Sequence, residues 1–149
     1  MRAVIQRVDH AGVRINHQEF SSINEGILVF LGIEKGDSDI DADYILEKSI
    51  NLRIFEDKQD KMNVSLLDID GSMMVVSQFT LLGDCIKGRR PSFTAAEEPV
   101  KANELYGYFI EKAKEKVTHV AAGKFQEMMK IELINNGPVT ILLDSRKKF

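Results

Sequence analysis

Residues 27–33 are the part of this sequence that most constrains the fold. They read Ile-Leu-Val-Phe-Leu-Gly-Ile, with no charged side chain among them. A short apolar run of this kind, rich in branched residues, is typical of a strand buried on both faces. We therefore expect other elements of the chain to cover both sides of this strand.

Further strand signals lie on both sides of this segment. Apolar and polar residues alternate near the start of the chain, and apolar runs follow turn residues in its second half. The predicted strands cover residues 3–8, 13–15, 27–33, 73–81, 128–134 and 139–144, with turns at 9–12, 70–71 and 135–138.

Two segments have helical periodicity. A helix is predicted over 38–52, where acidic residues follow Ser38 and apolar residues recur on one face. Pro99 is suited to the first turn of a second helix, with apolar positions every three or four residues. This order predicts an α+β fold with a curved, largely antiparallel, barrel-like sheet covered by two main helices. The 149 residues can bury one core, so we expect a single domain over 1–149.

Composition excludes several classes of protein. No run of about 18 apolar residues exists, and charges interrupt the first residues, so we expect a cytoplasmic protein without a membrane segment. Cys85 is the only cysteine, and His10, His17 and His119 lack metal-ligand spacing. The sequence therefore predicts no disulfide, no metal and no cofactor.

The charge is unevenly distributed along the chain. The net charge is -3, but residues 1–75 hold 8 Lys and Arg against 14 Asp and Glu, whereas residues 76–149 hold 12 against 9. Such an asymmetry is compatible with an electropositive face for a phosphate backbone, although charge alone favours the simpler explanation that these side chains are solvated.

The usual catalytic motifs are missing. There is no G-x-S-x-G nucleophile motif, no phosphate-binding glycine loop, and no histidine placed in sequence to activate a nucleophile. Two polar segments remain, Ser77–Thr80 and Asn136–Thr140, along with the basic loop 87–93. Spacing alone does not distinguish them from an ordinary strand end, a turn and a solvated loop, although the loop also suits RNA contacts.

Seven segments, in the same order along essentially the whole chain, resemble those of the D-aminoacyl-tRNA deacylases. They are Met1–Val8, Leu31–Asp37, Asn51–Asp57, Lys61–Asn63, Ser77–Leu81, Lys87–Phe93 and Asn136–Thr140.

The resemblance implies a homodimer with its active sites at the subunit interface. The Ser77–Thr80 motif of one subunit and the Gly137-Pro138 motif of the other would build each site. The Gly-Pro bond would be cis, with its carbonyls directed into the partner's pocket, where they would exclude an L-amino acid by steric contact. D-aminoacyl-tRNA would be the substrate, and achiral glycyl-tRNA would be accepted as well.

The resemblance also implies how the ester is hydrolysed. The 2'-hydroxyl of the tRNA would assist, and amides around Phe79 and Thr80 would stabilise the oxyanion. Ser77 and Gln78 would hold the substrate. A nucleophilic Thr80 hydroxyl is the alternative, although the sequence supplies no base for it.

Two segments depart from the family pattern. Phe125 and Met129 match residues that line the adenosine pocket, but Gln126 stands where the family usually has glycine. The loop Leu82–Ile86 lacks a usual cation. Two competing hypotheses remain, namely a non-catalytic RNA-binding module that uses the basic loop and a structural dimerisation domain.

Overall fold

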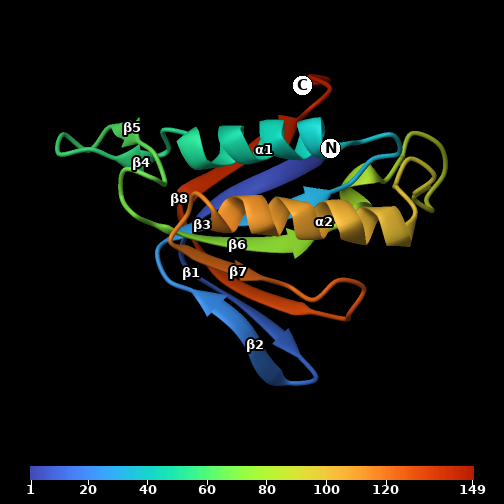
Figure 1. The fold of residues 1–149 in the computed structure, drawn as a ribbon, viewed down its shortest axis with the longest axis horizontal. Helices are drawn as coiled ribbons and strands as arrows, with labels where there is room; N and C mark the ends of the chain where they lie inside the picture. The colour runs from blue at the N-terminus through green and yellow to red at the C-terminus, as the bar shows by residue number, and fades with distance from the viewer.

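The two long strands near the ends of the sequence pair with each other in one curved sheet. The computed structural model describes residues 1–149, and Figure 1 shows two helices lying across one face of the sheet. The elements are β1 (Arg2–Ile15), β2 (Gln18–Ile23), β3 (Gly26–Gly32), α1 (Asp39–Asn51), β4 (Phe55–Glu56), β5 (Met62–Val64), β6 (Ser72–Ser77), the 3-10 helix η1 (Phe79–Leu82), α2 (Pro99–Lys114), β7 (His119–Ala122) and β8 (Lys130–Asp144).

The six-stranded sheet is mixed rather than largely antiparallel. β1 pairs antiparallel with β2, β3 and β8, but β3–β6 and β6–β7 are parallel pairs. The expectation of a largely antiparallel sheet is therefore corrected. The physical reason is that parallel neighbours need a long crossover, and α1 and α2 each lie in one of these two connections.

The first strand is longer than predicted. β1 continues through the expected turn at 9–12, where Ala11 is fully buried and pairs with Ile23 of β2 and Leu133 of β8. The chain reverses instead at Asn16 and His17, whose φ angles are 51° and 66°. Two left-handed residues form the tight turn that matches the twist of a hairpin.

Two further boundaries differ from the predictions. β6 ends at Ser77 instead of residue 81, and η1 follows it. The predicted turn at 135–138 lies within the continuous strand β8. Gln6 of β1 pairs with Thr140 and Val8 pairs with Asn135, so five residue steps of β8 lie opposite two residue steps of β1. The segment therefore bulges from the strand without reversing it.

The central strand has both faces buried, as its sequence predicts. Ile27, Val29 and Leu31 belong to a core under the two helices, whereas Leu28 belongs to a second core inside the curved sheet. Side chains of a strand alternate between its faces, so β3 contributes to both cores.

Neither helix has the length and apolar character that a membrane-spanning helix requires.

Both helix starts agree with the predictions. Ser38 precedes α1, and the Asp41 carboxylate accepts its backbone N–H at 2.9 Å. Pro99 opens α2 in the first turn, where its missing N–H has no intrahelical role.

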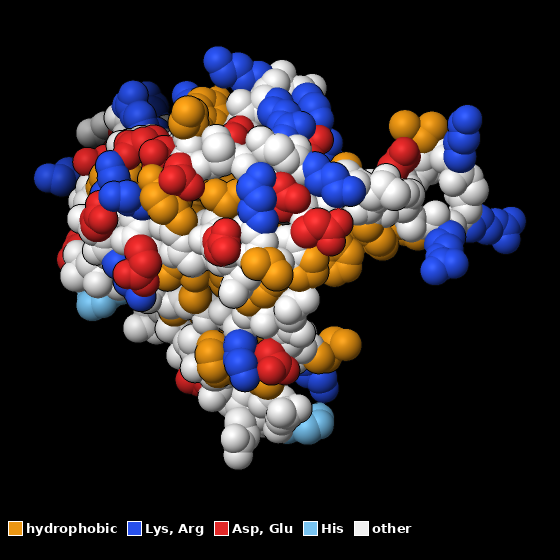
Figure 2. All heavy atoms as spheres, turned by 45° about the vertical axis from the view of Figure 1, so that its right-hand side comes forward, with side chains coloured by type: hydrophobic (Ala, Val, Ile, Leu, Met, Phe, Trp, Pro, Cys, Tyr) orange, Lys and Arg blue, Asp and Glu red, His pale blue; other side chains and the backbone are white.

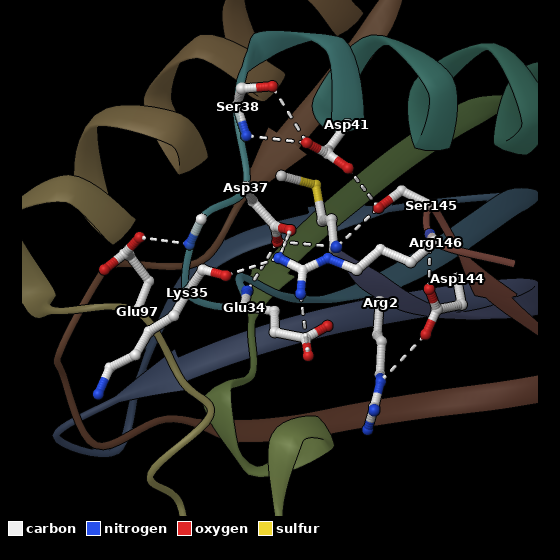
Figure 3. A network of polar contacts seen from close by, with 12 residues as sticks. Arg2, Glu34, Lys35, Asp37, Ser38, Asp41, Glu97, Asp144, Ser145 and Arg146 are labelled. Carbon is white, nitrogen blue, oxygen red and sulfur yellow. Dashed lines mark hydrogen bonds and ion pairs between the residues drawn. The ribbon is translucent and has the colours of Figure 1, made fainter. Parts of the chain in front are cut away.

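A polar network fixes the end of β8 beside the start of β1 (Figure 3). Its centre is Asp37, whose carboxylate lies 2.8 Å from the Met1 ammonium group and 3.0 Å from the Arg146 guanidinium. The Ser145 hydroxyl accepts a hydrogen bond from Met1 and donates one to Asp41, each at 2.7 Å. These contacts hold the C-terminal end of β8 against the N-terminal end of α1.

Candidate active site

The Ser77–Thr80 motif forms a turn at the end of the central parallel strand β6. The Gln78 N–H donates to the Leu31 carbonyl at 2.8 Å, and the Gly83 N–H donates to the Thr80 carbonyl at 3.0 Å. Leu82 is buried against Gly32, where a β-carbon would lie only 2.6 Å from the Leu82 Cδ2 atom. The turn is therefore anchored to the core although Phe79 and Thr80 are exposed.

Phe79 and Thr80 of this turn are exposed, Ser77 and Gln78 are half-buried, and no catalytic base contacts them. Phe79 is 58% exposed, and the Gln78 amide donates to the Thr80 hydroxyl. No histidine or carboxylate hydrogen-bonds to Ser77 or Thr80. The first N–H groups of a helical turn have no acceptor within it, and here they belong to Phe79 and Thr80. The turn thus offers main-chain donors but no activated nucleophile.

The loop between β7 and β8 brings Phe125 and Met129 to the same end of β6. The Gly123 N–H donates to the Val75 carbonyl at 2.8 Å, and the Met129 sulfur would lie 2.7 Å from a β-carbon at Gly123. The Phe125 ring packs against Tyr106 of α2 with 5.8 Å between centroids. This loop forms an apolar wall near the Ser77–Thr80 turn.

Tyr106 fixes this wall from behind. Its hydroxyl lies 2.8 Å from the Val75 carbonyl oxygen and 3.1 Å from that of Gly123. Burial raises the pKa of Tyr106 well above its ordinary value of 10.0, so the hydroxyl remains a donor at every physiological pH.

Gln126 adopts a left-handed backbone conformation with φ of 61°. Glycine adopts this conformation without a β-carbon penalty, which explains why glycine suits this position. Gln126 therefore occupies a backbone conformation that favours glycine.

The Gly137-Pro138 motif lies on the exposed bulge of β8, and its peptide bond is cis. Arg7, only 6% exposed, holds this segment: its Nε donates to the Asn136 carbonyl at 3.0 Å and its Nη1 to the Ile54 carbonyl at 2.6 Å. On the far side of the motif, the Val139 N–H donates to the Asn135 side-chain oxygen at 2.8 Å.

Arg7 is a residue that the sequence reasoning missed. An arginine in a strand resembles a solvated residue, but period-two counting puts Arg7 on the same face as the buried residues Ala3 and Ile5. The alternation of residues along this strand is the sequence pattern that predicts the burial of Arg7.

The two polar motifs do not meet within one chain. Across the sheet, Ser77 is in register with Leu31 and then Ala3, whereas Gly137 lies in the bulge of β8 that faces residues 6–8 on the other side of β1. The four residue steps from Ala3 to Arg7 correspond to about 13 Å along the strand, and three strand spacings of about 4.8 Å lie between β6 and β8. One chain therefore supplies two separate parts of the predicted site.

Comparison with known proteins identifies the family of this chain. A family model described as D-Tyr-tRNA(Tyr) deacylase matches residues 4–144. Proteins named D-aminoacyl-tRNA deacylase from Syntrophus aciditrophicus (strain SB) and Clostridioides difficile (strain 630) are 63% and 54% identical, and each match covers 100% of both chains.

Two solved structures have the same fold. One, named c-Myc DNA Unwinding Element Binding Protein, has a TM-score of 0.92 and 36% identity over 97% of this chain and 98% of its own. The other, described as a probable eukaryotic D-amino acid tRNA deacylase, has a TM-score of 0.80 over 95% and 97% of the two chains, but its 16% identity supports the fold alone. Together with the family model and the full-length relatives, these likenesses show that the chain belongs to the D-aminoacyl-tRNA deacylase family of hydrolases.

Proposed function

We propose that residues 1–149 act as a single domain that hydrolyses the ester bond of D-aminoacyl-tRNA in the cytoplasm, with two copies of the chain building each active site. The Ser77–Thr80 turn of one copy would receive the Gly137-Pro138 motif of the other. The observation that carries this proposal is the separation of the two motifs within one chain. A second copy is the simplest way to bring them together.

The exposed edge of β8 supports a dimer. β8 pairs with β1 along one edge, and its other edge is unpaired. Two apolar side chains of this strand, Ile134 and Leu142, are 58% and 57% exposed. Long unpaired edges with apolar side chains are unusual in monomers, because they promote association. Since Gly137 and Pro138 lie between these two residues, an interface along β8 would place the motif against the partner.

Chiral selection would arise from steric exclusion. In this proposal the main chain of Gly137 and Pro138 forms a wall that an L side chain meets and a D side chain avoids. The wall is stiffened by Arg7 and Asn135. Glycine has no side chain to exclude, so glycyl-tRNA would also be hydrolysed.

Hydrolysis would use main-chain donors and the 2'-hydroxyl of the terminal adenosine. The N–H groups of Phe79 and Thr80 would stabilise the oxyanion, Ser77 and Gln78 would hold the substrate, and Phe125 and Met129 would contact the adenosine. The Thr80 hydroxyl is the less favoured nucleophile, because its hydrogen bond comes from Gln78 and no base contacts it.

Release of amino acid from D-tyrosyl-tRNA, L-tyrosyl-tRNA and glycyl-tRNA tests the function directly. We expect rapid release from the D-tyrosyl and glycyl substrates and little from the L-tyrosyl substrate. Equal release from the D and L forms would contradict the proposed selection. RNA binding without any release would favour the non-catalytic RNA-binding module instead.

Two substitutions separate the roles of the motifs. Thr80→Ala should retain substantial activity, whereas a loss of about 10⁴-fold or more in a folded variant would identify the hydroxyl as the nucleophile. Gly137→Ala should increase release from L-tyrosyl-tRNA, because φ is 126° and the new β-carbon would lie 2.7 Å from Val139 Cγ2 and 2.9 Å from Arg7 Nη2. Unchanged selectivity in Gly137→Ala would remove this segment from the site.

A further inference from the structure

A basic arm, which we define as residues Asp84–Ser92, stands off the body of the protein. Figure 2 shows it at the right-hand side, with Lys and Arg side chains at its end. Every residue of the arm is exposed, and Gly88 adopts a φ of 74° near its tip. The four residue steps from Asp84 to Gly88 give it a reach of up to about 13 Å.

The base of the arm is fixed beside the candidate active site. Asp84 and Ser92 exchange two backbone hydrogen bonds of 2.8 and 2.9 Å, and the Asp84 carboxylate accepts the Ile86 N–H at 2.8 Å. Directly after the arm, the Phe93 ring packs edge-on against Phe79, with 5.1 Å between centroids. The position of the arm is therefore coupled to the turn that carries Phe79 and Thr80.

The charges at the end of the arm are not neutralised by the chain. Lys87, Arg89 and Arg90 take part in no ion pair, whereas the lysines of α2 and several arginines of the body are paired with carboxylates. The only acid of the arm is Asp84, which already binds the backbone. Three cations thus project from a protein whose net charge is -3.

We propose that the basic arm binds the phosphates of the single-stranded acceptor end of the tRNA, immediately before the nucleotide that carries the amino acid. This inference rests on the proposed function, because the ester would lie at the turn beside Phe79. The nearest anionic groups of the substrate are then the phosphates of the preceding nucleotides, within reach of the arm. Cations on the arm offset the repulsion between an acidic body and RNA, and they steer the acceptor end toward the turn.

The test compares a triple variant, Lys87→Ala with Arg89→Ala and Arg90→Ala, with a control variant, Lys58→Ala with Lys61→Ala, that removes two cations from the exposed β4–β5 hairpin. With D-tyrosyl-tRNA at low salt, the triple variant should raise KM at least about tenfold, and the hairpin variant should leave KM unchanged. Three lost phosphate contacts should reduce the slope of log KM against log salt by about 2. Between 50 and 200 mM salt, the factor by which KM rises should therefore be roughly 20-fold smaller in the triple variant than in the wild type.

Two further measurements make the result specific. Replacement of Arg89 and Arg90 by lysine should preserve the salt slope, because the charge remains. The wild-type protein should hydrolyse D-tyrosyl-adenosine, a substrate without phosphate, with almost no salt dependence. Equal KM values and slopes in the triple variant and the wild type would overturn the role of the arm. Absence of wild-type activity on both substrates would instead reject the proposed function.

Discussion

β6 and β8 each carry one polar motif, but they hold it in different ways. The turn after β6 follows a strand whose residues Met73–Val76 are all buried, and the backbone together with Leu82 anchors it to the core. The Gly137-Pro138 bulge lies on an open edge, where Arg7 and Asn135 hold it by side-chain hydrogen bonds. A motif on the centre of the sheet thus depends on packing, whereas a motif on the edge depends on a few polar groups.

The largest effect should come from the centre of the sheet. Ile27→Ala removes a fully buried side chain of β3 and should lower the free energy of unfolding by about 2–5 kcal/mol, measured by denaturant titration. Leu142→Ala on the exposed edge of β8 is the control and should change the stability of the isolated chain by about 0.5 kcal/mol or less. A larger loss at Leu142 in dilute monomer would contradict the comparison.

A smaller effect is expected at the polar anchor of the edge. Arg7→Leu leaves the Asn136 and Ile54 carbonyls without their donor and should cost about 1–3 kcal/mol. It should also raise hydrolysis of L-tyrosyl-tRNA relative to the D form. Arg14→Leu, on the same strand but exposed and paired with Glu132, should change neither quantity appreciably. Similar behaviour of both variants would show that the Arg7 contacts do not position the motif.

Replacing the left-handed residue Gln126 in the β7–β8 loop by glycine should increase the stability of the protein. Gln126→Gly should raise the free energy of unfolding by up to about 1 kcal/mol, because the β-carbon penalty of the left-handed region disappears. Gln126→Ala keeps that penalty and serves as the control. A thermal melt in which glycine gives no advantage over alanine would contradict this explanation.

The smallest effect concerns the end of β8 that the polar network holds. Burial opposes ionisation of Asp41, but hydrogen bonds from Ser145 and Ser38 outweigh it and lower the pKa below its ordinary value of 3.8. The stabilisation is therefore complete above about pH 4 and is lost as the pH falls through the lower folded pKa. In Ser145→Ala the unfolding free energy should depend less steeply on pH below 4, measured by denaturation between pH 2 and 6. An unchanged slope would rule out this hydrogen bond as the cause.

Much of the architecture could be predicted from local sequence patterns. The helix starts at Ser38 and Pro99 and the doubly buried strand at 27–33 depend on capping, proline geometry and an apolar run, which are properties of short segments. The roles of the candidate site residues stay predictions, but the family resemblance is confirmed by the full-length relatives.

Other features required the tertiary structure, because they depend on which distant segments become neighbours. The parallel pairing of β6, the bulge in β8 and the burial of Arg7 beside Asn136 all arise from contacts between residues far apart in the chain. The sequence by itself determined that two polar motifs exist and which segments carry them. Only the tertiary structure decided that these motifs lie on different strands of one sheet, with β3 and β1 between them, since strand register is set by pairing across the whole molecule.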